Sequence, residues 1–368
     1  MTASTRTSAL AERHRNLGSG LEDWNGMGTA WSYNSDPNDE HDAVRQAAGM
    51  FDMSPLKKVM LRGPDAGRVV DHVISRDMSR VASGMSAYGS ILTEEGTVCD
   101  DAIIANNGQN EWMHCHGSGD SMSMLTESAR GLNVDIELDD DLHNISLQGP
   151  AALDILNPHA SADLSTLGYF HHTATALFGH PCRISRTGYS GERGYEIFVP
   201  AAAVGDIWDH ILGSGADAGV MPCSFASLDK VRIEAALLFF GYDMTAEHTP
   251  WEVGLGFTVN KSGGDYRGKE AALVAEKSPR FVAAGISSEN EESWEGGETL
   301  LANGNAVGTL NSPCWSHRLG KSLALVHIAA DQSAPGTQLQ VQADGSTSSA
   351  IVESIPFFDP SKSRTHDG

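Results

Sequence analysis

Basic residues and long apolar runs are both scarce in this sequence. The 368 residues include 25 lysines and arginines against 48 aspartates and glutamates, which gives a formal net charge of −23 at pH 7. A nucleic-acid binder needs clustered basic side chains, and no such block occurs, so we expect no nucleic-acid partner. The longest apolar stretch, Ala235–Phe240, is far shorter than the ~18 residues of a membrane span, so we also expect no membrane association.

Cysteines are few, and they do not form a C-x-x-C pair. The five widely spaced thiols therefore predict reduced core residues rather than a zinc or redox site. His114-Cys115-His116 places two histidines on one face of an expected strand, but no third ligand follows at a diagnostic spacing, so we predict no metal. The N-terminal stretch Met1–Asn16 lacks the apolar core of a secretory signal, which predicts a cytoplasmic protein.

The order of patterns along the chain predicts an α+β fold. Leu61–Ile74 and Leu147–Leu156 resemble each other: each has an apolar strand end, then Gly-Pro, then a helical period. Between them, turn signals at Glu95-Gly96 and Asn107-Gly108 separate expected hairpin strands at Ser90–Leu92, Val98–Ile104 and Glu111–His116. A strand at Tyr195–Val199 precedes expected helices at about Ala202–Gly213 and Leu228–Leu238. After Pro279 short strands alternate with turns at Glu295–Gly297, Asn303–Asn305 and Asp344–Ser346, which predicts an all-β end.

The adjacent pair Asp100-Asp101 is the first candidate site. Successive side chains of a strand point to opposite faces, so one carboxylate should lie on each side of the sheet. The apolar continuation Ala102–Ile104 indicates a buried strand. A buried carboxylate is costly unless it is hydrogen-bonded or functional, which makes this pair a candidate for chemistry; a strand-end carboxylate that caps a turn is the alternative.

A glycine-rich segment and a charged helix are further candidates. Three glycines in Arg186–Glu196 could let the backbone approach a planar ligand, with Glu192 and Glu196 as acceptors for its N–H groups; a tight hairpin explains the glycines as well. Asp229 and Arg232 share a helical face, as in an ordinary salt bridge.

Six sequence motifs, in their order along the chain, resemble those of the aminomethyltransferase family, which comprises the T-protein of the glycine cleavage system and its relatives. The resemblance extends from about Trp24 to Pro356. The motifs are AGMFDMS (Ala48–Ser54), RTGYSGERGYEI (Arg186–Ile197), LDKVRIEAALLFFG (Leu228–Gly241), TPWEVGL (Thr249–Leu255), YRGKEA (Tyr266–Ala271) and LGKSLA (Leu319–Ala324).

The resemblance implies a cloverleaf of three domains. They are an α+β folate-binding domain (1–55 with 140–275), an α+β ferredoxin-like domain (56–139) and a C-terminal β-barrel (276–368). Tetrahydrofolate as co-substrate is implied in the central hole. By the same resemblance Asp101 is the catalytic residue, Glu196 reads the pterin ring, and Tyr88 lines the folate site. We also expect folate contacts from Tyr189, Asp229 and Arg232, and we consider Arg232, Arg318 and Lys321 as partners of the folate tail.

Departures from the T-protein pattern favour a different one-carbon donor. Leu228 stands where T-proteins carry an arginine, Ser54-Pro55-Leu56 replaces their Ser-His-Met, and His116 falls near a family asparagine. The chain therefore looks closer to tetrahydrofolate-dependent demethylases of the dimethylsulfoniopropionate type.

We therefore predict an enzyme that moves a methyl group from a small sulfonium, ammonium or ether donor to N5 of tetrahydrofolate. Such a donor would fit an aromatic wall. The aromatic and imidazole side chains available for this pocket are His116, Trp24, Trp31, Tyr33, Trp251 and Trp315. The alternatives are a true T-protein that acts on a lipoylated carrier protein, and a non-catalytic folate-binding module.

Overall fold

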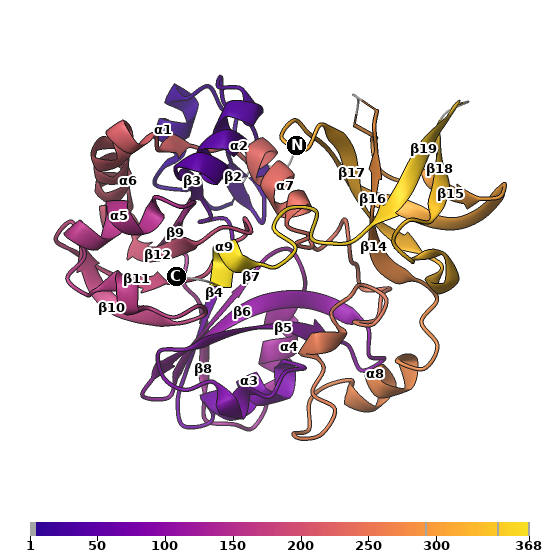
Figure 1. Cartoon of the computed structure of the whole chain (residues 1–368). Coiled ribbons are helices and arrows are strands. Elements are labelled where there is room, and N and C mark those ends of the chain that lie inside the picture. Colours follow the sequence, from indigo (N-terminus) through magenta and orange to yellow (C-terminus); the bar gives the residue numbers. More distant parts are fainter. Residues whose placement is uncertain (1–4, 291–292, 344–345, 367–368) are drawn as a thin grey trace.

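Three β-sheets define three lobes in the computed structural model, which describes residues 5–290, 293–343 and 346–366 (Figure 1). The first sheet has six strands in the order β10-β11-β12-β9-β3-β13, antiparallel except for the β13–β3 pair. Its strands are β3 (Gly49–Asp52), β9 (Leu142–Gln148), β10 (His172–Leu177), β11 (His180–Ser185), β12 (Gly194–Pro200) and β13 (Met221–Pro222).

Two helices cover one face of this sheet, α5 (Ala152–Leu156) and α6 (Ala201–Gly215). Their apolar side chains, among them Trp208, pack against fully buried residues of β9 and β12 such as Leu147 and Tyr195. The other elements of this lobe are α1 (Ala11–Asn16), β1 (Glu22–Trp24), β2 (Met27–Thr29) and α2 (Pro37–Gln46).

The second sheet has five strands in the order β5-β6-β7-β4-β8. They are β4 (Lys57–Arg62), β5 (Ser86–Leu92), β6 (Val98–Gly108), β7 (Glu111–His116) and β8 (Asp135–Leu138), with helices α3 (Ala66–Val73) and α4 (Ser121–Ser128) on one face. The predicted hairpin strands are confirmed, and the predicted turn at Glu95-Gly96 joins β5 to β6. The second turn lies two residues later than predicted, because Asn107 and Gly108 still belong to β6 and the chain reverses at Gln109 and Asn110, both with positive φ. In each repeat of the strand-to-helix unit the proline lies just before the N-cap residue rather than inside the helix.

The third sheet closes into a six-stranded barrel, as predicted for the end of the chain. Its strands are β14 (Val282–Ser288), β15 (Thr299–Ala302), β16 (Asn305–Ser316), β17 (Lys321–Ile328), β18 (Gln338–Ala343) and β19 (Ser346–Glu353). The turn at Asn303–Asn305 is present, whereas the one at Asp344–Ser346 falls partly outside the described residues. After the barrel the chain returns to the six-stranded lobe and ends in α9 (Ser363–His366) (Figure 1).

Helix α7 (Phe225–Glu234) lies where the first lobe meets the barrel and packs against α2, β16 and β17. It ends four residues earlier than predicted, because Ala236 adopts a φ of +54° and the backbone turns. The following segment, with α8 (Lys269–Ala275), packs apolar side chains against Leu92 and Val98 of the second sheet. No helix of the described part of the chain combines the length and apolar character that a membrane span needs.

Candidate functional site

Asp100 and Asp101 point to opposite faces of the second sheet. Both residues lie within the regular part of β6, where Asp101 is paired with Ser90 of β5 and Ala102 with His116 of β7. Successive side chains of such a strand point to opposite faces of the sheet. Asp100 lies on the side covered by α3 and α4, whereas Asp101 lies on the side that faces the first lobe. The strand geometry predicted from the sequence is therefore confirmed.

Asp101 lies half-buried beside Tyr88, whose hydroxyl donates a hydrogen bond to Asp101 Oδ2 at 2.9 Å. Burial and the neighbouring Asp100 charge raise the pKa of Asp101 to about 7, although the Tyr88 hydrogen bond acts in the opposite direction. At neutral pH both forms of this carboxyl group are populated, which suits a group that both accepts and donates a proton.

Asp100 belongs to a separate, fully buried network. It accepts hydrogen bonds from His116 Nδ1 at 2.7 Å and from Ser121 Oγ at 2.6 Å. Burial alone would raise the pKa of Asp100, but these hydrogen bonds and the charge of His116 hold it below its usual value. His116 therefore faces the helices, and the structure does not bring it to Asp101 as a pocket residue.

Glu196 projects from β12 toward the sheet face that carries Asp101. Two residues further along β12, Phe198 packs against Met113 and Cys115 of β7. Since Cys115 is paired with Ile103, which shares its face with Asp101, the two carboxyl groups point into the same space between the lobes. Both side chains are therefore directed toward the interface between the two lobes, although they lie 95 residues apart in the sequence.

The Glu196 carboxylate accepts hydrogen bonds from Asn144 Nδ2 at 2.8 Å and from the Thr187 hydroxyl. Burial raises the pKa of Glu196 above its usual value. Asn144 Oδ1 is buried and has no hydrogen-bond partner among the described residues. Glu196 and Asn144 therefore offer acceptors to the N–H groups of a planar ligand.

The glycine-rich segment serves the fold more than a ligand. A Cβ atom on Gly188 or Gly194 would lie 2.0 or 2.2 Å from Gln148 Oε1, so these glycines make room for that side chain rather than for a bound molecule. Glu192, considered above as a ligand acceptor, is instead paired with Arg45 at 3.0 Å and Arg364 at 2.6 Å. Of the two glutamates only Glu196 faces the space between the lobes.

An adjoining cavity of about 290 Å³ opens between the first lobe and the barrel. Three predicted folate contacts line it, Tyr189, Asp229 and Arg232, together with Trp31. The remaining lining residues are Phe225, Leu228, Phe239, Tyr242, Trp294, Glu295, Asn311, Ser312 and Pro313. Trp294 was missed by the sequence reasoning, because it reaches the cavity only through closure of the barrel.

Arg232 is almost fully committed to neighbouring side chains. Its guanidinium contacts Asp229 Oδ1 at 2.7 Å and Asp243 Oδ2 at 2.5 Å, and it donates to Ser312 Oγ. Arg318 and Lys321 likewise pair with acidic side chains. Each of these three predicted partners of the folate tail therefore already has an acidic partner. Of the two carboxylates paired with Arg232, Asp229 is half exposed and Asp243 is buried.

The other predicted aromatic residues do not share one wall. Trp24 packs against Phe225 and Phe239, with ring centroids 5.0 and 5.7 Å apart, at the edge of the cavity. Tyr33 is buried, and its hydroxyl contacts His14 Nδ1 at 2.8 Å. Neither Tyr33 nor Trp315 lines the cavity, and the Trp251 indole donates to the backbone of Ala272.

Comparisons with known proteins agree with this architecture. The family model described as GCVT N-terminal domain matches residues 10–263, and the glycine cleavage T-protein C-terminal barrel domain matches residues 280–359. The aminomethyltransferase T structure from Bartonella henselae superposes with a TM-score of 0.89 at 24% identity and covers 97% of this chain and 99% of that one.

Two curated relatives extend over nearly the whole chain. The heme-dependent oxidative N-demethylase gamma subunit of Ectopseudomonas mendocina (strain ymp) is 44% identical over 374 residues, covering 99% of both chains. The aminomethyltransferase of Streptomyces avermitilis is 32% identical over 363 residues, covering 96% of this chain and 97% of its own. The chain belongs to the glycine cleavage T-protein (GCVT) family.

Proposed function

We propose that this chain transfers a one-carbon unit derived from an N-methyl amine to tetrahydrofolate, and that it does so as one subunit of a demethylase assembly. The observation that carries the proposal is the Asp101 carboxyl group, which accepts a hydrogen bond from the Tyr88 hydroxyl at 2.9 Å and whose pKa burial raises to about 7. The 44% identity with a gamma subunit of an oxidative N-demethylase supports both the donor class and the protein partners.

The family binds tetrahydrofolate, and the residues present fit this co-substrate. Glu196 would accept hydrogen bonds from the N–H groups of the pterin edge, and the unpartnered Asn144 Oδ1 beside it offers a further acceptor. Burial of these acceptors makes the contact selective, because a ligand without matching donors would leave them unpaired. Tyr189 and Asp229 line the adjoining cavity, where the rest of the folate could lie.

Oxidation of an N-methyl amine leaves the methyl carbon at the oxidation level of formaldehyde. Condensation of that carbon with N5 and N10 of tetrahydrofolate forms two C–N bonds and releases water, with no net redox change. One step needs an acid, to protonate the departing hydroxyl, and another needs a base, to remove the proton from nitrogen. Asp101 can serve in both because its pKa lies near 7, and Tyr88 positions its carboxylate.

Direct methyl transfer to N5, predicted from the sequence, is the second candidate. It requires alignment and a base, and Asp101 could act as that base. The third candidate is aminomethyl transfer from a lipoylated carrier, favoured by the 32% identity with aminomethyltransferases but opposed by Leu228 at the position of the T-protein arginine. The three candidate reactions differ in the one-carbon donor that each requires.

The test follows the folate product by mass spectrometry under anaerobic conditions. The tag-free chain is incubated with tetrahydrofolate and, in separate reactions, ¹³C-formaldehyde, ¹³C-methylated amines and sulfonium compounds, and an aminomethylated lipoyl carrier. Reactions without protein and with Asp101→Asn measure the spontaneous condensation.

The proposal predicts that the chain accelerates formation of ¹³C-methylene-tetrahydrofolate and that Asp101→Asn abolishes most of the acceleration. Formation of 5-[¹³C]methyl-tetrahydrofolate from an intact donor would replace it with direct methyl transfer, and a product from the lipoyl carrier alone would restore the T-protein function. Folate binding without any acceleration would indicate a non-catalytic module.

A further inference from the structure

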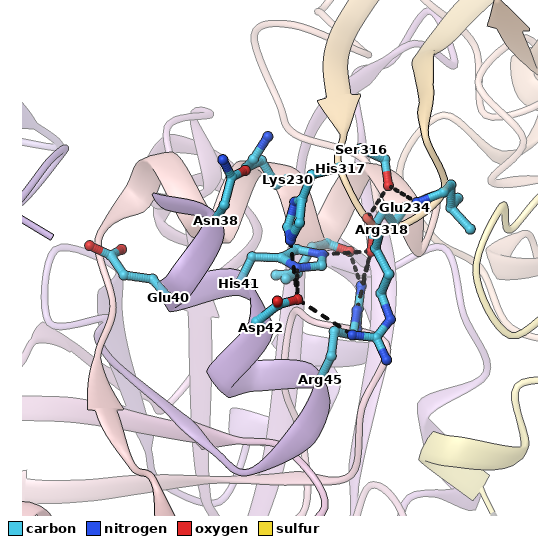
Figure 2. Close-up of polar contacts among 12 residues, drawn as sticks. Asn38, Glu40, His41, Asp42, Arg45, Lys230, Glu234, Ser316, His317 and Arg318 are labelled. Carbon is cyan, nitrogen blue, oxygen red and sulfur yellow. Dashed lines mark hydrogen bonds and ion pairs between the residues drawn. The ribbon is translucent and has the colours of Figure 1, made fainter. Parts of the chain in front are cut away.

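His41, Asp42 and His317 meet where α2 faces the turn between β16 and β17 (Figure 2). One ligand atom from each side chain lies within 4.8 Å of the other two. Within residues 5–290, 293–343 and 346–366, it is the only such cluster of three histidine, cysteine or acidic side chains. The site lies apart from Asp101 and Glu196, and the proposed folate chemistry does not use it.

We propose that these three side chains form a binding site for one zinc ion that fastens α2 to the barrel. Two histidines and one carboxylate are a ligand set that zinc commonly takes, with water as the fourth ligand. The spacing of the three residues along the chain matches no metal motif, so the sequence did not predict this site.

Two of the three separations between the ligand atoms are close to those around a zinc ion, and the third, between the two histidine nitrogens, is at most 4.8 Å. Asp42 Oδ1 lies 3.5 Å from His41 Nδ1 and 3.1 Å from His317 Nε2. Two ligand atoms of a tetrahedral zinc ion, each at about 2.0–2.1 Å, lie roughly 3.3–3.4 Å apart. Small rotations of the half-exposed Asp42 and His317 side chains would complete the coordination.

The Nδ1 atom of His41 is the second, independent observation. His41 is fully buried, and its Nδ1 has no hydrogen-bond partner among the described residues. Its Nε2 lies 2.9 Å from Glu234 Oε2, an oxygen that also accepts from Arg45 Nη2 at 2.8 Å. A carboxylate oxygen can only accept, so Nε2 donates to it, and Nδ1 is the buried ring nitrogen that faces Asp42 Oδ1 at 3.5 Å.

Glu234 orients His41 in the way that outer carboxylates orient zinc-bound histidines. The carboxylate is itself fixed, because Glu234 Oε1 accepts from Ser316 Oγ at 2.6 Å and Oε2 accepts from Arg45. Figure 2 shows these contacts, in which Glu234 of α7 links His41 and Arg45 of α2 to Ser316 at the end of β16. The first ligand is therefore held in place before any ion arrives.

An ion could reach the site from solvent. The Asp42 side chain is 40% exposed and that of His317 is 24% exposed, whereas His41 forms the floor. Arg318 Nη1 lies 3.4 Å from Asp42 Oδ1 and is the competing cation. Its side chain is one-third exposed, so it can move aside when zinc binds.

The test titrates zinc chloride into the tag-free full-length chain after treatment with a chelator, followed by calorimetry and by thermal unfolding. We expect one zinc ion per chain and a higher unfolding temperature in the presence of zinc, since a ligand that binds the folded state stabilises it. Cobalt(II) in place of zinc should give visible absorption bands, which report coordination directly.

His317→Gln removes the most accessible histidine ligand and should abolish both the stoichiometric binding and the thermal shift. His210→Gln is the matched control. His180 and His210 also flank one carboxylate, that of Asp206, at 2.5 and 3.4 Å, but these side chains are exposed and contact different oxygens. Binding by His210→Gln should equal that of the original chain.

Asp42→Asn, at an exposed position, is the second variant and should weaken zinc binding about tenfold or more while the chain stays folded. The proposal would be overturned if the original chain bound no stoichiometric zinc, or if His317→Gln and His210→Gln bound zinc equally well. His41 Nδ1 and Asp42 would then share a proton rather than a metal ion. Neither readout involves folate, so this outcome is independent of the proposed transfer reaction.

Discussion

Asp100 and Asp101 are adjacent on β6 yet hold their protons over different pH ranges. Asp100 is ion-paired with His116 under the helices, which holds its pKa below the usual value, whereas burial raises the pKa of Asp101 to about 7. The alternation of side chains in a strand thus places one permanent charge and one titrating group on opposite faces of the same sheet.

Asp101→Asn should stabilise the fold while it removes activity. A carboxyl group whose pKa is higher in the folded than in the unfolded state lowers stability as pH rises from about 4 to about 7. The variant lacks this penalty, so its free energy of unfolding should exceed that of the original chain by about 4 kcal/mol at pH 8 and by less than about 1 kcal/mol at pH 4. Urea unfolding at both pH values measures the difference; an equal difference at the two values would contradict the raised pKa.

Tyr88→Phe should raise the pKa of Asp101 further. The Tyr88 hydroxyl donates to the ionised carboxylate, so its loss removes about 0.5–1.5 kcal/mol of stabilisation from that form. The pH midpoint of Asp101 should therefore move upward by about 0.5–1, as measured by NMR titration of ¹³C-labelled carboxyl groups. Tyr242→Phe, at an exposed tyrosine, is the control, and an unchanged or lower midpoint in Tyr88→Phe would count against this contact.

Glu196→Gln should weaken binding of tetrahydrofolate by about 10–100-fold. A hydrogen bond to a charged group contributes about 1.5–3 kcal/mol, and the amide offers the pterin edge one acceptor and an unwanted donor. Anaerobic calorimetry with tetrahydrofolate measures the loss, and the exposed Glu95→Gln serves as control. If both variants bound folate equally well, Glu196 would not read the pterin.

Arg45→Met should destabilise the fold by about 3–5 kcal/mol, because it leaves buried carboxylates without their cation. Arg45 contacts Glu192 at 3.0 Å and Glu234 at 2.8 Å, and all three side chains are almost inaccessible to solvent. Arg68→Met, which breaks an exposed pair with Asp65, should change stability by less than about 1 kcal/mol. Urea denaturation of the two variants provides the comparison.

Much of the fold follows from local patterns. Period-two alternation placed β6 and β7 and predicted that Asp100 and Asp101 face opposite sides, because strand geometry depends only on neighbouring residues. The helix predicted over Leu228–Leu238 extends four residues too far at its C-terminal end. Ala235–Phe240 is apolar enough for a helix, but the backbone turns at Ala236. That turn depends on contacts with other segments, such as the Tyr189 hydroxyl on the Leu238 carbonyl.

The residues of the candidate site likewise fall into those that local motifs predicted and those whose position depends on tertiary packing. The motifs around Asp101 and Glu196 are local and led to both residues. His116 was predicted near the donor because it falls near a family asparagine, and Tyr33 and Trp315 were predicted there by residue type alone. The structure turns His116 toward Asp100 and buries Tyr33 against His14, because the face of a strand and the packing of a lobe decide where a side chain points.

The sequence by itself determined the α+β order of elements and the family, and it singled out Asp101 and Glu196 as candidate site residues, because each of these depends on short segments read in order. Only the tertiary structure decided which side chains share a space. The approach of Glu196 to the face of Asp101, the entry of Trp294 into the cavity and the meeting of His41 with His317 all join distant segments. Such contacts arise from the packing of three lobes, which no local pattern encodes.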